Sequence, residues 1–259
     1  MSVNTHLLSL GSSLVLGSEK NGISTSVSTL SSRASNYFDT DFTGQFIFGS
    51  YDRNTILPRK ADSNSDVDYM LVFKKELSMK PQTYLDRVKR FANKYYSSST
   101  IKQSFPTIRL ELNHIMFELV PAYYEYGLYY IAQKGYNSDT WQSTDPSQAR
   151  VDLQTANKRT NYNTKPAIRI VKYWNALNGG VYDSYSIESY IVNSFSLGYY
   201  DLKSIVFSAC LSLNENGLSK SNTNKVQKLK STIRTVQQYE REGYPATAES
   251  ELKKVLPEL

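Results

Sequence analysis

The stretch FIFGSYDRNTILPRKADSNSDVDYMLVF (residues 46–73) holds the features that decide the fold. An apolar run ends at Gly49 and Ser50, a polar segment follows, and a second apolar run begins with Asp66 and Asp68. Both runs are rich in aromatic and β-branched residues, which predicts two strands. Because side chains alternate along a strand, the two aspartates share one face. The stretch therefore predicts a strand that carries two carboxylates into an otherwise apolar sheet.

Two carboxylates this close are costly unless something neutralises them. Burying an unpaired charge is unfavourable, and each carboxylate hinders the ionisation of the other. A divalent cation bound between them removes this cost, and oxygen ligands at a strand end suit Mg²⁺ or Mn²⁺. The alternative is an Asp-x-Asp pair with a purely structural role at an exposed strand end.

A third carboxylate, Glu118, interrupts the apolar run HIMFELVPAYY (residues 114–124). If this strand lies beside the Asp-x-Asp strand, three carboxylates converge. Such a set can hold two metal ions about 4 Å apart for in-line phosphoryl transfer, and the third acid can serve as general base. The alternative is that Glu118 pairs with Arg109 or Lys102 across a hairpin.

The Gly-Ser pair at the end of the first run has two readings. Glycine lets backbone N–H groups approach phosphate oxygens, and a helix that begins there adds a favourable dipole. Gly49 and Ser50 are therefore candidates for a phosphate cradle. The alternative is a simple turn.

The pattern along the rest of the N-terminal half predicts a mixture of helices and strands. Apolar residues at helical spacing predict helices within residues 4–38 and over 81–96. The segments TIRLELN and HIMFELVPAYY predict a β-hairpin that turns at Asn113 and His114. A polar, tyrosine-rich connection is expected from there to about residue 143.

After residue 145 the strand signals fade and helical periodicity takes over. We expect an α+β protein of two lobes. Residues 1–150 form a small mixed sheet with flanking helices, and residues 151–259 form a helical lobe. The active site is expected in the cleft between them.

Composition bounds the chemistry further. The chain has 259 residues, a net charge of +6, one cysteine and two histidines. A single cysteine excludes a disulfide framework and a cysteine-rich zinc site, and Cys210 is interpreted as a small buried hydrophobe. The basic charge favours polyanionic partners. No signal peptide or membrane-spanning stretch is recognisable, so we expect a soluble cytoplasmic protein.

The order Gly-Ser, spacer, Asp-x-Asp resembles the signature of the DNA polymerase β-like nucleotidyltransferases, and MFELVPAY resembles their third-carboxylate strand. The closer resemblance is to the cGAS/DncV-like nucleotidyltransferases (CD-NTases, SMODS type), which are relatives of oligoadenylate synthetase. Further stretches match this subgroup in order: TWQSTDP (140–146), NKRTNYNTKPAIRIVKYWN (157–175), SYSIESYIV (184–192) and the closing segment 229–259.

The resemblance implies a role for each matched residue of the N-terminal half. Gly49 and Ser50 would hold the β- and γ-phosphates of the incoming nucleotide. Asp66 and Asp68 would bind both of two Mg²⁺ or Mn²⁺ ions. Glu118 would complete the second metal site and help to activate the acceptor hydroxyl. Aspartate is common at this third position, so the longer glutamate is a departure.

The resemblance also implies roles in the helical half. Lys172 would reach the triphosphate, Ser184 would contact phosphate and Tyr185 would stack on a base. The alternative for Lys172 is a solvated helix face, and the alternative for Tyr185 is packing at a helix N-terminus.

The function that the resemblance implies is metal-dependent transfer of nucleotidyl groups. NTPs or dNTPs would be joined into a short cyclic or linear oligonucleotide second messenger, with release of pyrophosphate, in bacterial anti-phage defence. Partners would be the nucleoside triphosphates and a downstream effector that senses the product. The zinc element of animal cyclic GMP–AMP synthase is impossible with one cysteine, so a nucleic-acid activator is not indicated.

Two alternatives remain open. The same carboxylates could transfer a nucleotidyl group to a tRNA, a protein or an antibiotic. Segment 157–175 has four basic residues that could then contact an RNA acceptor, namely Lys158, Arg159, Lys165 and Arg169. A solvated helix face is the simpler interpretation of these four residues. The other alternative is a catalytically inactive nucleotide-binding module.

Overall fold

The structure is a computed structural model that describes residues 2–76, 78–133, 140–195 and 200–259. The chain divides into two compact units. The first, here called the helical unit, comprises residues 1–15, 54–63 and 151–259, and the second, the sheet unit, comprises residues 16–53 and 64–150.

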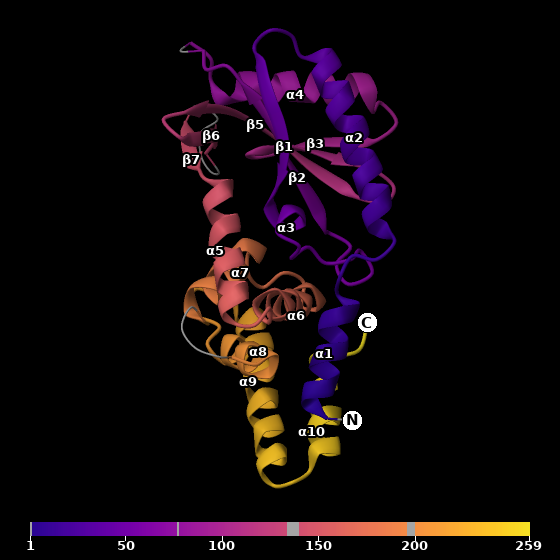
Figure 1. Cartoon of the computed structure of the whole chain (residues 1–259), viewed down its shortest axis with the longest axis vertical. Helices are drawn as coiled ribbons and strands as arrows, with labels where there is room; N and C mark the ends of the chain where they lie inside the picture. Colours follow the sequence, from indigo (N-terminus) through magenta and orange to yellow (C-terminus); the bar gives the residue numbers. More distant parts are fainter. Residues whose placement is uncertain (1, 77, 134–139, 196–199) are drawn as a thin grey trace. The chain divides into compact units, whose positions relative to one another are not determined.

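The sheet unit is built on a mixed sheet (Figure 1), whose strand order is β1-β2-β5-β4-β3, with β6 paired to β5 and β7 paired to β6. Strands β2 and β5 are parallel, whereas the other pairs are antiparallel. The strands of the described residues are β1 (Phe42–Phe48), β2 (Asp66–Phe73), β3 (Thr100–Ser104), β4 (Thr107–Glu111), β5 (Met116–Glu125), β6 (Leu128–Ala132) and β7 (Trp141–Thr144).

One face of this sheet is a hydrophobic core covered by helices α2 and α4. Phe73 of β2 lies 5.6 Å from Tyr84 of α4 and 5.0 Å from Phe38, which ends α2, measured between ring centroids. The helices of this unit are α2 (Glu19–Tyr37), α3 (Gly49–Asp52) and α4 (Pro81–Tyr95). The predicted helix over 81–96 is confirmed, with Pro81 in its first turn, where the missing N–H costs nothing.

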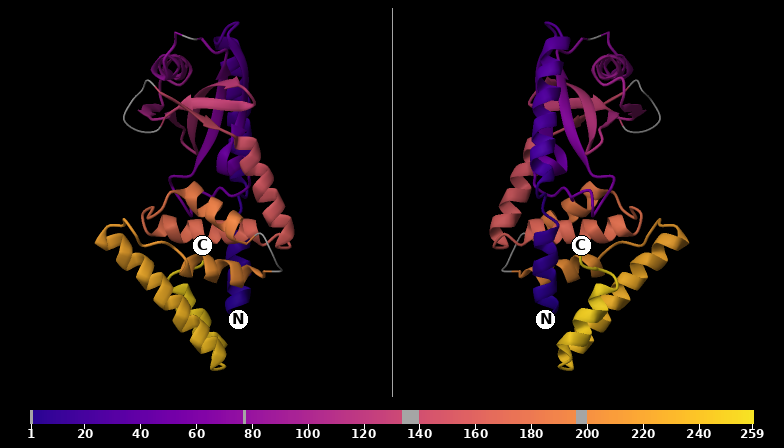
Figure 2. Two further views of the ribbon diagram at one scale, coloured as in Figure 1. Left: turned by 90° about the vertical axis from the view of Figure 1, so that its left-hand side faces the viewer. Right: turned by 90° about the vertical axis from the view of Figure 1, so that its right-hand side faces the viewer.

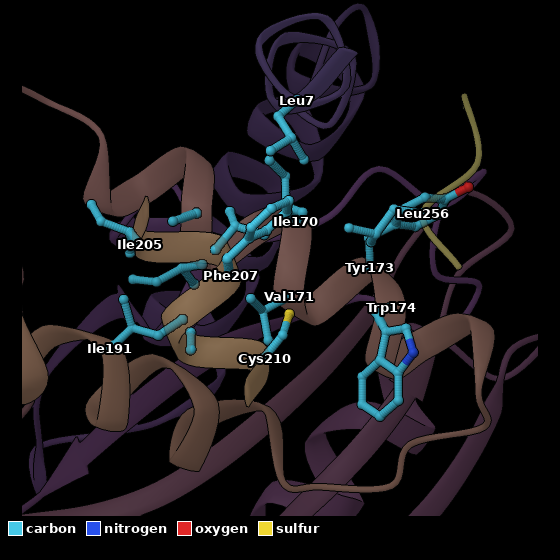
Figure 3. Close-up of a cluster of buried hydrophobic side chains, with 14 of the residues drawn as sticks. Leu7, Ile170, Val171, Tyr173, Trp174, Ile191, Ile205, Phe207, Cys210 and Leu256 are labelled. Atoms are coloured by element: carbon cyan, nitrogen blue, oxygen red, sulfur yellow. The ribbon is translucent and has the colours of Figure 1, made fainter. Parts of the chain in front are cut away.

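The helical unit encloses its own core. Most residues of helix α6 are buried, and Ile170, Val171, Tyr173 and Trp174 of this helix lie in the core (Figure 3), with Trp174 only 1% exposed. Helices α9 and α10 form an antiparallel pair (Figure 2). The helices are α1 (Val3–Ser13), α6 (Thr164–Leu177), α7 (Ser184–Ser194), α8 (Leu202–Leu211), α9 (Lys220–Arg241) and α10 (Pro245–Lys253). Helix α5 (Pro146–Arg159) begins in the sheet unit and continues into the helical unit.

Cys210 of α8 faces this helical core. It is fully buried, and desolvation raises the pKa of its thiol to about 12. The interpretation of this cysteine as a small hydrophobe is confirmed, because a thiol held neutral in an apolar core is a poor nucleophile.

The α+β class and the mixed sheet with flanking helices agree with the prediction, as do the strands on either side of the Gly-Ser pair and the hairpin of β4 and β5. The units differ from the predicted division at residue 150, because segments 1–15 and 54–63 pack with the helices. The connection expected up to residue 143 was wrong in part, since it contains β6 and β7.

The missed strands owe their stability to tertiary contacts. Tyr130 of β6 stacks on Tyr123 of β5 with ring centroids 4.9 Å apart, and Trp141 of β7 lies edge-on to Tyr123 at 4.8 Å. Cross-strand aromatic pairs of this kind stabilise short strands that have little pattern of their own. Among the described residues, no helix is both long enough and apolar enough to cross a membrane.

Candidate active site

The two aspartates lie at the start of β2, on the sheet face opposite to α2 and α4. Asp68 is directly paired with Glu118 in the parallel register of β2 and β5, and Asp66 is paired with Met116. Directly paired residues of neighbouring strands project from the same face, so the three acidic side chains share it. All three side chains are partly buried.

The Gly-Ser turn is packed against the second aspartate. Gly49 has φ of +71°, a conformation that side chains other than that of glycine rarely adopt. A Cβ atom on Gly49 would lie only 1.7 Å from Oδ2 of Asp68. Glycine is therefore required here both by the backbone and by the space, and it brings the turn into contact with the Asp68 carboxylate.

The third carboxylate is held by a neighbouring strand. Nε of Arg109 donates a hydrogen bond of 2.9 Å to Oε1 of Glu118, from the position directly opposite on β4. The Arg109 side chain is 39% exposed and that of Glu118 is 19% exposed. The pairing of Glu118 with Arg109, which sequence left as an alternative, is confirmed.

This ion pair affects how a metal ion could be held. Within the part of the chain that the structure describes, no three His, Cys, Asp or Glu side chains are grouped closely enough to hold an ion. Asp66 and Asp68 nevertheless fit a divalent cation as hard oxygen donors on one strand face. Glu118 is in register to join them through its second carboxylate oxygen, because the bond to Arg109 uses only Oε1.

A small hollow of about 210 Å³ adjoins the cradle within the sheet unit. It is lined by rings of Phe46, Phe48 and Tyr129 and by the ion pair between Asp52 of α3 and Arg150 of α5, whose atoms lie 3.4 Å apart. A hollow lined by aromatic rings can accept a planar group.

Lys172 of α6 lies in the helical unit and is only 5% exposed. Its Nζ donates to Oε2 of Glu188 at 3.2 Å and to the carbonyl oxygen of Thr55 at 3.3 Å, while Oγ1 of Thr55 donates to the same carboxylate at 2.6 Å. The solvated helix face offered as its alternative was wrong. Contact of Lys172 with a triphosphate stays a prediction, and its ammonium group already has two partners here.

Arg169, one turn earlier on α6, is also buried. Its guanidinium donates to the carbonyl oxygens of Asn54 at 3.0 Å and Gly11 at 3.3 Å. Burial lowers the pKa of Arg169 to about 10, which leaves it charged at neutral pH. Both interpretations offered for it, an RNA contact and a solvated face, were wrong, because a residue 7% exposed serves neither.

These contacts hold the loop between the cradle and the aspartates. Segment 54–63 of that loop belongs to the helical unit, and Arg169 and Lys172 both bind its backbone carbonyls at Asn54 and Thr55. The loop is thus an anchored element. Sequence missed the anchor, because Glu188 reads as an ordinary charged position of α7 and Thr55 as a loop residue.

The other two predicted residues of the helical unit lie at the start of α7. Ser184 and Tyr185 are exposed, with 53% of the tyrosine accessible. Asp183 caps the helix by accepting a hydrogen bond of 2.8 Å from the backbone N–H of Ser186. Their roles toward a nucleotide stay predictions.

A family model and a curated relative both match this chain, and both concern the synthesis of nucleotide second messengers or cyclic nucleotides. The model of the Second Messenger Oligonucleotide or Dinucleotide Synthetase domain (SMODS) matches residues 1–157. A probable cyclic nucleotide synthase from Bacillus cereus (strain VD146) is 32% identical over 107 residues, which cover 38% of this chain and 31% of that protein. The match therefore spans less than a third of the length of that relative.

Solved structures with the same fold have little sequence identity to this chain. The structure of CdnC from E. coli MS115-1 in a complex with HORMA-deltaN has a TM-score of 0.72 at 11% identity, covering 99% of this chain and 98% of that one. CdnG of Bradyrhizobium diazoefficiens, in complex with GTP, has a TM-score of 0.67 at 8% identity, covering 97% of each chain. DncV of Vibrio cholerae, a cyclic AMP-GMP synthase, has a TM-score of 0.62 at 13% identity, covering 82% of this chain and 68% of that one. The family model covers more than half of the sequence, including the cradle and all three acids, and the chain belongs to the SMODS family of second-messenger oligonucleotide or dinucleotide synthetases.

Proposed function

We propose that the chain is a metal-dependent nucleotidyltransferase that joins NTPs or dNTPs into a short cyclic or linear oligonucleotide second messenger. The observation that carries the proposal is the contact between the Gly49 turn and the Asp68 carboxylate, with Glu118 paired to Asp68 on the next strand. A phosphate-binding turn and converging carboxylates are the two parts that nucleotidyl transfer needs.

The chemistry follows from these parts. A 2′- or 3′-hydroxyl of one nucleotide forms a bond to the α-phosphorus of another, the bond from that phosphorus to the α,β-bridging oxygen breaks, and pyrophosphate leaves. Gly49 and Ser50 hold the phosphates of the donor. Glu118 would accept the proton of the attacking hydroxyl.

The metal would be Mg²⁺ or Mn²⁺, which Asp66 and Asp68 would hold with Glu118 as the third ligand, and two ions are expected per site. When bound, such ions supply positive charge that stabilises the transition state and the leaving pyrophosphate. Lys172, Ser184 and Tyr185 are proposed to contribute the remaining nucleotide contacts, Lys172 after exchange of one of its present partners.

The cellular role rests on the family. A product of this kind acts through an effector that senses it, and the expected setting is the cytoplasm of a bacterium defending itself against phage. ATP is bound in a solved structure of CdnC and GTP in that of CdnG, which supports nucleoside triphosphates as substrates.

The test is incubation of the purified chain with all four NTPs and all four dNTPs in Mg²⁺ or Mn²⁺, with release of pyrophosphate as the readout. Release that needs no further acceptor supports the proposal. Release only on addition of tRNA, protein or an aminoglycoside favours transfer to another acceptor. No release, together with metal-dependent nucleotide binding in calorimetry, favours an inactive binding module.

A further inference from the structure

A single row of residues crosses the sheet face opposite to α2 and α4, through the proposed site. Asp68 is paired with Glu118, Glu118 with Arg109, and Arg109 with Lys102, so that the row passes from β2 through β5 and β4 to β3. Directly paired residues project from the same face. The row therefore has two acids at one end and two bases at the other.

The cradle lies at the acidic end of this row. Phe48, which precedes Gly49, is paired with Asp68 from the β1 side. The order across the sheet is thus cradle, Asp68, Glu118, Arg109 and Lys102. The carboxylates therefore lie between two groups that favour phosphate, the cradle on one side and the two basic residues on the other. Only the cradle has a role in binding the donor.

Arg109 and Lys102 both have hydrogen-bond donors that a ligand could use. Arg109 uses Nε for Glu118, and its two terminal amino groups make no hydrogen bond or ion pair within the described residues. Lys102 is exposed and has no ion pair there either. A guanidinium whose orientation is fixed by a carboxylate is suited to hold a phosphate with its remaining donors.

We infer that Arg109 and Lys102 bind the 5′-phosphates of the acceptor nucleotide, so that the acceptor is a nucleotide and not a neutral hydroxyl compound. The inference deepens the proposed function and rests on it. It assigns the cradle to the donor and the basic end of the row to the acceptor.

The spacing of the strands fits this assignment. Neighbouring strands lie about 5 Å apart, so β4 and β3 lie about 5 Å and about 10 Å from the strand of Glu118. One sugar ring separates the 3′-hydroxyl of a nucleotide from its 5′-phosphates. An acceptor whose hydroxyl lies at Glu118 can therefore reach Arg109 and Lys102 with these phosphates.

The competing explanation is that Arg109 only neutralises Glu118 and that Lys102 is an ordinary solvated lysine. This explanation predicts no dependence of the reaction on a phosphate carried by the acceptor. The two explanations therefore differ in a measurable preference and not only in overall activity.

The experiment separates donor from acceptor. The donors are the four 2′,3′-dideoxynucleoside 5′-triphosphates, which have no hydroxyl to attack with, and the acceptors are the four nucleosides or their 5′-monophosphates, which cannot act as donors. The readout is kcat/KM for each acceptor with the wild type, Lys102→Gln, Arg109→Gln and the control Lys20→Gln. Lys20 is an exposed lysine of α2.

We expect the wild type and Lys20→Gln to have a higher kcat/KM with monophosphates than with nucleosides. In each of the other two variants the ratio of these two values should fall about tenfold, mainly because the KM for the monophosphate rises. Equal use of nucleosides and monophosphates by the wild type, or an unchanged preference in Lys102→Gln, overturns the inference and leaves the proposed function standing. Lys102 is exposed, so this variant tests the site even if Arg109→Gln fails to fold.

A binding measurement covers the case in which no acceptor yields product. Absence of product counts against the proposed function. Equilibrium dialysis of radiolabelled AMP in EDTA then tests the site by itself: weaker binding by Lys102→Gln than by Lys20→Gln supports it, and equal binding by the two variants overturns it.

Discussion

The charged residues of the two units are held in opposite ways. In the sheet unit, Asp68, Glu118 and Arg109 lie in register on one sheet face, and the arginine side chain is 39% exposed. In the helical unit, the side chains of Lys172 and Glu188 are 5% and 3% exposed and share their atoms with a loop. The first arrangement leaves the arginine partly accessible to a ligand, whereas in the second the buried charges fix a loop. The comparison predicts that substitutions in the first region abolish chemistry and that substitutions in the second unfold the protein.

The largest effect is expected for Asp68→Asn. Loss of one metal-binding carboxylate next to the cradle should lower the rate of pyrophosphate release by at least about 10³-fold, on the scale of removing an essential group that stabilises transition-state charge. Thermal unfolding followed by circular dichroism shows whether the variant stays folded. A folded variant that retains a tenth of the activity would contradict the assignment of the chemistry to the acids of the sheet unit.

Lys172→Met tests the structural side. Removing Lys172 leaves the buried Glu188 carboxylate without the cation of its ion pair, which should lower the free energy of unfolding by about 3–5 kcal/mol. Chemical denaturation measures the change. The double variant Lys172→Met with Glu188→Leu is the matched control and should recover part of the loss, since it removes both charges. A single variant as stable as the wild type would show that this cluster is not an anchor.

Gly49→Ala tests the contact between the cradle and the Asp68 carboxylate. The added Cβ would overlap Oδ2 of Asp68 and would force φ of +71° on an alanine. A displacement of the carboxylate by about 1 Å should lower kcat by about 10²-fold. Gly44→Ala is the control, because nothing lies within 4 Å of its Cβ position. Equal kcat values for the two variants would contradict the packing described here.

The smallest effect concerns the ion pair between Asp41 and Arg87 on the core side of the sheet unit. The hydrogen bond from Arg87 lowers the pKa of Asp41 below 3.8. Because the pKa of the folded state is depressed, the pair stabilises the protein above about pH 4 and loses this contribution as the pH falls through the lowered value.

Asp41→Asn should therefore lower the free energy of unfolding at pH 7 by about 0.2–1 kcal/mol. The difference from the wild type should shrink as the pH falls below 3.8. Urea denaturation at several pH values measures it. A difference that does not change with pH would mean that the charge of Asp41 contributes nothing.

Local pattern was enough for the sequence to predict the strand with Asp66 and Asp68 and the third acid. A carboxylate in an apolar run stands out, and the parallel pairing then brings Glu118 beside Asp68. The resemblance supplied the order of the elements. The pairing with Arg109 was foreseeable only as one of several options, because register decides it.

What the sequence could not predict depends on long-range packing. Arg169 and Lys172 look like residues of a helix surface, and only the fold shows that they bury themselves against loop carbonyls. The assignment of segments 1–15 and 54–63 to the helical unit arises in the same way. Strands β6 and β7 are held by contacts among aromatic rings, which leave no periodic signal.

The most direct test of the central claim is mass spectrometry of the products formed from four NTPs and four dNTPs in Mg²⁺ or Mn²⁺. The account predicts that the wild type yields a short oligonucleotide with pyrophosphate and that the double variant Asp66→Asn, Asp68→Asn yields neither. The same oligonucleotide from the double variant at the wild-type rate would contradict the claim that the sheet face with the three acids carries the chemistry.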